Sequence, residues 1–73
     1  MIWNVVKDCN DYNDKPTCWA CEINSPIYGK YLWITKNSNG YDIEYNINDE
    51  FITIATTLYL CDAFNQAESL IKE

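Results

Sequence analysis

The strongest constraint on the fold is a segment, residues 41–48, in which apolar and polar residues alternate without a break. The apolar members are Tyr41, Ile43, Tyr45 and Ile47, and the polar members are Asp42, Glu44, Asn46 and Asn48. A period of two predicts an antiparallel strand with one face in a core and the other, acidic face in water. Asn39-Gly40 favours a tight turn before it, because both residue types tolerate positive φ. Together with the apolar segment Tyr31–Thr35, this pattern predicts a β-hairpin.

Further strands are expected on both sides of the hairpin. The segments rich in β-branched and aromatic residues are Ile2–Lys7, Cys18–Asn24 and Phe51–Leu60, the last as one strand or as two pieces. Residues 8–17 are rich in Asn, Asp and Pro and predict a loop.

The last segment changes to a helical period. Its apolar positions are three and four apart, at Phe64, Ala67, Leu70 and Ile71. This spacing predicts a short helix from Ala63 to Ile71 that is capped by Asp62. We therefore predict a single α+β domain over residues 1–73. It consists of a small antiparallel sheet of four or five strands with one C-terminal helix packed on a face.

Charge narrows the possible functions. Five lysines face eleven carboxylates, with no arginine or histidine, and the formal net charge is −6. Such a chain repels nucleic acid and anionic lipid, and its field favours a basic protein surface instead. The alternative is that the acidity only keeps the protein soluble. We expect no enzyme, because imidazole chemistry is excluded and no nucleophile–base pair can be assembled.

Four cysteines carry most of the chemical information, at positions 9, 18, 21 and 61. The Cys18–Cys21 spacing suits a zinc knuckle, Cys9 lies across the loop from Cys18, and small domains often need a metal. We predict one structural zinc site with Cys9, Cys18, Cys21 and Cys61 as ligands, which makes the fold metal-stabilised. An aspartate in place of Cys61, iron in place of zinc, unligated thiols, disulfides and a redox pair are the alternatives. Because a knuckle must turn locally, the second strand is expected to begin nearer Cys21 than Cys18.

The expected compartment is the cytoplasm. The first residues turn polar at once, which is unlike a secretory signal, and no apolar run approaches the ~20 residues that span a bilayer.

Aromatic and acidic side chains supply the candidates for partner binding. Tyr12, Trp19 and Tyr28 flank loops and are interface candidates, whereas Trp3 and Trp33 are expected in the core. Carboxylates that can face a basic partner are Asp11, Asp14, Asp42 and Glu44.

The overall profile resembles the small acidic anti-CRISPR proteins of bacteriophages that inhibit type II-A nucleases. The likeness lies in the length, the Asn/Ile/Tyr/Lys-rich composition, the absence of Arg and His, and the cysteine set. It implies a phage-encoded inhibitor, acting in the host cytoplasm, that binds a type II CRISPR effector nuclease and blocks its loading with nucleic acid. The alternative is a zinc-stabilised interaction or regulatory domain of a bacterial complex.

Overall fold

The computed structural model describes residues 2–6 and 17–71. Its elements are β1 (Asn4–Val5), β2 (Cys18–Ser25), β3 (Gly29–Asn37), β4 (Gly40–Ile47), β5 (Glu50–Thr57) and α1 (Leu60–Ile71). The α+β class, the antiparallel sheet and the C-terminal helix are confirmed, and the sheet has five strands. Metal stabilisation of the fold is not shown.

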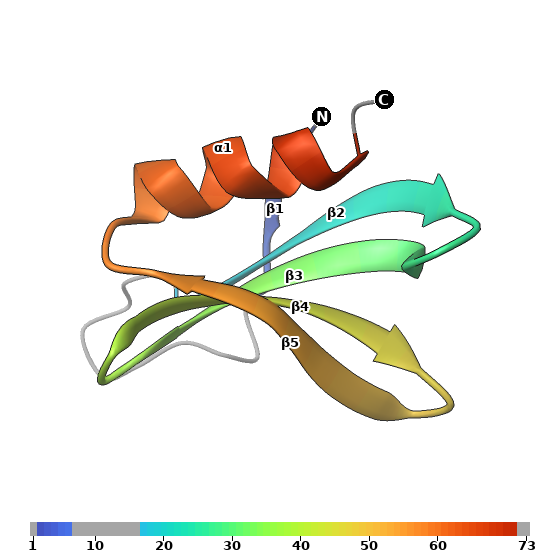
Figure 1. The fold of residues 1–73 in the computed structure, drawn as a ribbon, viewed down its shortest axis with the longest axis horizontal. Helices are drawn as coiled ribbons and strands as arrows, with labels where there is room; N and C mark the ends of the chain where they lie inside the picture. Colours follow the sequence, from blue (N-terminus) through green and yellow to red (C-terminus); the bar gives the residue numbers. More distant parts are fainter. Residues whose placement is uncertain (1, 7–16, 72–73) are drawn as a thin grey trace.

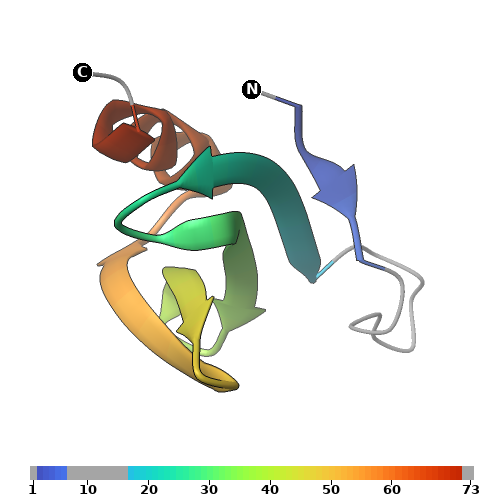
Figure 2. The same cartoon turned by 90° about the vertical axis from the view of Figure 1, so that its right-hand side faces the viewer.

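The sheet is an antiparallel meander in the order β1-β2-β3-β4-β5, with α1 lying over one face (Figure 1). Every strand pairs with its neighbour in sequence, and short turns connect β2 to β3, β3 to β4 and β4 to β5. The strands are strongly twisted, and the sheet curls when it is seen from the side (Figure 2). β1 is a two-residue strand along the outer edge of β2, which is shorter than the segment 2–7 that the sequence predicts.

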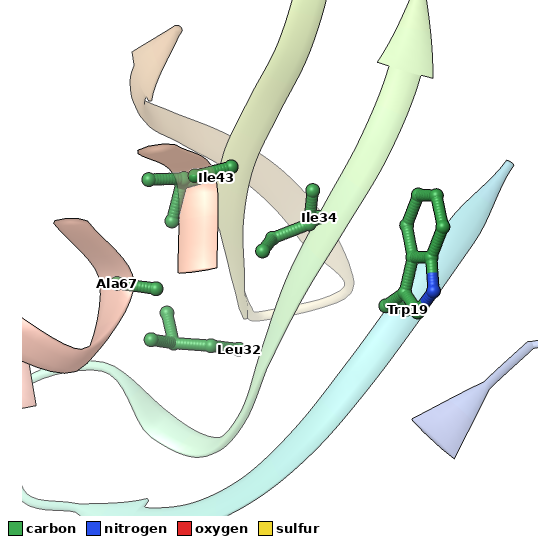
Figure 3. Close-up of a cluster of buried hydrophobic side chains, with 6 residues drawn as sticks. Trp19, Leu32, Ile34, Ile43 and Ala67 are labelled. Carbon is green, nitrogen blue, oxygen red and sulfur yellow. The ribbon is translucent and has the colours of Figure 1, made fainter. Parts of the chain in front are cut away.

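The core lies between the sheet and α1. Leu32, Ile34 and Ile43 are fully buried, and Ala63 and Ala67 face them from the helix. Figure 3 shows Leu32, Ile34 and Ile43 in one cluster with Ala67, and Trp19 beside it on β2. The two alanines lack long side chains, which lets the helix approach the large residues of the central strands.

Alternation along β4 matches the predicted faces. Ile43 is fully buried under the helix, and Asp42 and Glu44 lie on the opposite side of the sheet. The strand ends at Ile47, and Asn48 and Asp49 form the next turn with φ of 54° and 65°. Two consecutive positive φ values are typical of the two-residue hairpin turn that Asn and Asp favour.

The boundary between β5 and α1 differs from the prediction. β5 ends at Thr57, and α1 begins at Leu60, so Asp62 lies in the first helical turn and does not cap the helix. The Ala63 amide donates to the Tyr59 carbonyl at 3.1 Å. A carboxylate in the first turn still interacts favourably with the positive end of the helix dipole.

Candidate functional site: the open face of the sheet

The side of the sheet away from α1 is the candidate functional surface, and we call it the open face. Strand register assigns its residues, since cross-strand partners share a face. Its central members are Glu22, Tyr31, Trp33, Thr35, Asp42, Glu44, Asn46, Phe51, Thr53 and Thr56. The surface therefore combines aromatic rings, carboxylates and hydroxyls on four neighbouring strands.

Three aromatic rings form a continuous cluster on the open face. The Trp33 and Phe51 centroids are 5.0 Å apart with the ring planes at 78°, and Tyr31 lies 5.7 Å from Trp33. Phe51 is 58% exposed, although burial of its ring would be favourable. The Lys30 ammonium lies over the Tyr31 ring, 5.5 Å from its centroid. One ring of the cluster thus already receives a cation from the protein itself.

Two carboxylates lie beside this cluster. Asp42 is held by short hydrogen bonds, since its Oδ2 accepts from Asn37 at 2.6 Å and its Oδ1 from Thr56 at 2.7 Å. Glu44 lies directly opposite Trp33 in the β3–β4 register, and its Oε1 accepts from the Thr35 hydroxyl at 3.2 Å. Their hydrogen-bond partners among the described residues are hydroxyls and an amide, which carry no charge.

The environment of Glu44 disfavours its charge. Burial raises the pKa of Glu44 above its ordinary value, and repulsion by Asp42 adds to this, while hydrogen bonds from Thr35 and Thr53 lower the pKa in part. A partly desolvated carboxylate gains more from an incoming cation than a fully hydrated one does.

A shallow hollow extends the open face toward β1. It has a volume of about 610 Å³ and is lined by Ile2, Asn4, Glu22 and Asn24. Glu22 lies opposite Tyr31 in the β2–β3 register, so the hollow adjoins the aromatic cluster. The open face therefore carries Glu22 at the Tyr31 end of the aromatic cluster and Glu44 beside its middle ring, Trp33.

The cysteines are not brought together in the part of the chain that the structure describes. β2 begins at Cys18 and pairs regularly with β3 from Cys18 to Glu22, so the expectation of a local turn before Cys21 is wrong. Three positions apart on a regular strand, Cys18 and Cys21 point to opposite faces. Cys18 Sγ lies 3.7 Å from Thr35 Oγ1 on the open face, whereas Cys61 is exposed on α1. Cys9 lies outside the described residues.

The described residues do not test the four-cysteine site, because Cys9 is not among them. Among residues 2–6 and 17–71, no three cysteine, aspartate or glutamate side chains lie close enough together to hold a metal. Zinc thus stays a prediction from the cysteine spacing, and we derive no function from it.

Chelation distinguishes a fold that depends on a four-cysteine zinc site from a fold that does not. Because the described core forms without joining Cys18 to Cys21, we expect excess EDTA to leave the thermal midpoint unchanged. A four-cysteine zinc site instead requires one equivalent of metal by elemental analysis and a large fall in the midpoint on chelation.

The other predicted site residues divide into three groups. Asp42 and Glu44 lie on the open face, as their polar positions in the alternation indicated. Trp19 is only 9% exposed and belongs to the core, and Tyr28 packs on the helix side against Tyr45 at 5.3 Å. Asp11, Tyr12 and Asp14 lie outside the described residues.

Sequence reasoning missed the aromatic part of the open face. Trp33 was expected in the core, but the fully buried residues of β3 are its neighbours Leu32 and Ile34. The pairing of the two strands contains the signal for this placement. When Asn37 is paired with Gly40 across the predicted turn, Trp33 lies opposite Glu44, which belongs to the polar face.

Comparison with known proteins does not identify a family. No family model, no curated protein and no solved structure matches the chain. Within the described ranges, no helix combines the length and apolarity needed to cross a membrane.

Proposed function

We propose that this protein is a non-catalytic binding protein that docks its open face on a basic surface of another protein. The observation that carries the proposal is the Trp33–Phe51 pair, an aromatic anchor beside the carboxylate of Glu44. Aromatic residues in such positions dominate binding energy, and acidic groups around them select a basic partner and accelerate encounter.

Charge over the whole chain supports the same choice of partner. The formal net charge of −6 disfavours nucleic acid and anionic membranes as ligands. It favours proteins whose surfaces are basic because they bind nucleic acid.

A type II CRISPR effector nuclease is the specific partner we propose, on the basis of the anti-CRISPR resemblance. Such nucleases hold their guide–target heteroduplex in a positively charged channel. A small acidic protein bound in that channel would exclude nucleic acid without any chemistry of its own.

Charge neutralisation on the open face tests this proposal. We expect the double variant Asp42→Asn/Glu44→Gln to bind a purified type II nuclease about 10-fold more weakly at low salt, with a flatter salt dependence. The matched control is Asp62→Asn/Glu68→Gln, which removes the same charges from exposed positions on α1 and should bind like the wild type.

The stability of the variant separates lost binding from lost folding. A raised pKa in the folded state means that the stability contributed by Glu44 is fully present below its ordinary pKa and is lost as the pH rises through the folded-state value. Neutralising Glu44 should therefore not lower the thermal midpoint at pH 7. Unchanged affinity of the open-face variant would reject electrostatic docking, and no binding by the wild type would reject the nuclease as partner.

A further inference from the structure

We infer that the open face selects arginine, and not lysine, side chains of its partner, by stacking a guanidinium on the Trp33–Phe51 pair while its N–H groups bind Glu44. This inference rests on the proposed function and specifies the chemistry of that surface. It identifies the occupant as a protein segment that presents arginine.

The first step is the placement of the two recognition groups. Trp33 on β3 and Glu44 on β4 are direct cross-strand partners on the same face. Side chains of such pairs start about 5 Å apart at Cβ, so one ligand group can touch both. Phe51 packs against Trp33 at a centroid distance of 5.0 Å, so the two rings form one apolar surface next to the Glu44 carboxylate.

The second step excludes the other acceptors and rings. Both oxygens of Asp42 already accept short hydrogen bonds, from Asn37 and Thr56. Glu44 accepts from the Thr35 hydroxyl at 3.2 Å and from Thr53, and it keeps capacity for a ligand because a carboxylate can accept about four hydrogen bonds. Tyr31 is already approached by the Lys30 ammonium. Glu22 accepts from Asn24 at 3.2 Å, but it lies opposite Tyr31, the ring that Lys30 approaches, so we select Glu44 with Trp33 and Phe51 as the binding combination.

The third step is the choice between the two basic side chains. A guanidinium is planar, stacks on aromatic rings, gives up its hydration readily and presents parallel N–H donors to a carboxylate. An ammonium is a compact and strongly hydrated charge, which matches a fully solvated carboxylate better. Glu44 is half-buried beside Trp33, and burial raises its pKa, so this partly desolvated carboxylate favours the guanidinium.

Titration calorimetry with nona-arginine and nona-lysine peptides tests the inference, because the two probes carry the same charge. We expect the intact protein to bind nona-arginine about 10-fold more tightly than nona-lysine at equal ionic strength. Phe51→Thr, at an exposed position suited to a strand, should reduce this ratio to about 2-fold or less, as should Glu44→Gln. Glu68→Gln, an exposed position on α1, removes one charge elsewhere and should keep the wild-type ratio.

The possible outcomes separate the inference from the proposal beneath it. Equal affinity of the wild type for both peptides overturns arginine selection and leaves acidic docking intact. A preference for arginine that persists in both open-face variants also overturns it, since the preference would then arise elsewhere. Failure of both peptides to bind overturns docking and arginine selection together.

Discussion

Replacing Ile43 with alanine is expected to lower the free energy of unfolding by about 2–5 kcal/mol. Ile43 is 0% exposed on β4, Ile34 is its cross-strand partner on β3, and the small residues Ala63 and Ala67 belong to the same buried cluster on α1. Alanines cannot move side-chain atoms into the space that the substitution leaves, so most of the cavity should remain. A domain of 73 residues has a total stability of only about 4–11 kcal/mol, so we expect this loss to remove a large fraction of it.

Ile47→Ala provides the matched control for this experiment. Ile47 is on the same strand and follows the same alternation, but it is 47% exposed. We expect it to cost about 1 kcal/mol or less, because little packing is lost. Urea unfolding followed by tryptophan fluorescence measures both variants, and equal losses would contradict the assignment of the core.

Gly40→Ala is the second substitution with a large expected effect. Gly40 begins β4 with φ of 134°, a conformation that is strained for any residue with a Cβ. A Cβ at this position would collide with the carbonyl oxygen of Thr57 and lie 3.3 Å from the Leu58 Cα. Backbone atoms cannot rotate away, so the end of β5 and the entry to α1 must shift. We expect a loss of about 3 kcal/mol, from backbone strain and from this displacement.

Gly29→Ala measures the cost of backbone strain at positive φ without a steric collision. Gly29 also has positive φ, 85°, but a Cβ there would meet only the Asn46 carbonyl at an ordinary 3.5 Å. We expect about 1–2 kcal/mol for the conformation alone. If thermal or urea unfolding shows the same loss for both glycines, the close approach of β4 to residues 57–58 is wrong.

The sequence was most informative where local chemistry and periodicity agreed. The alternation after Asn39-Gly40 predicted the hairpin and the buried position of Ile43, and the structure confirms both. It was less informative between Thr57 and Leu60. That stretch is uncharged and rich in β-formers, and its helix begins without a Ser, Asp or Asn cap, so the boundary depends on tertiary packing.

Trp33 and the cysteines show why the site was harder to predict than the fold. The segment Tyr31–Thr35 has no alternation, so only pairing with β4 decides which side chains face the helix. The Cys18–Cys21 spacing is compatible both with a knuckle and with a regular strand, and pairing of β2 with β3 decides between them. Both errors concern the pairing register between strands, which cannot be deduced from the spacing of residues along the chain.

The central claim, that partners bind the open face, is tested most directly by two-dimensional heteronuclear NMR of the protein with nona-arginine. The account predicts that the largest shifts occur at the Trp33 indole N–H and at amides of Phe51 and Glu44, with α1 unaffected. Shifts concentrated on residues 60–71, with an unchanged Trp33 indole signal, would contradict it.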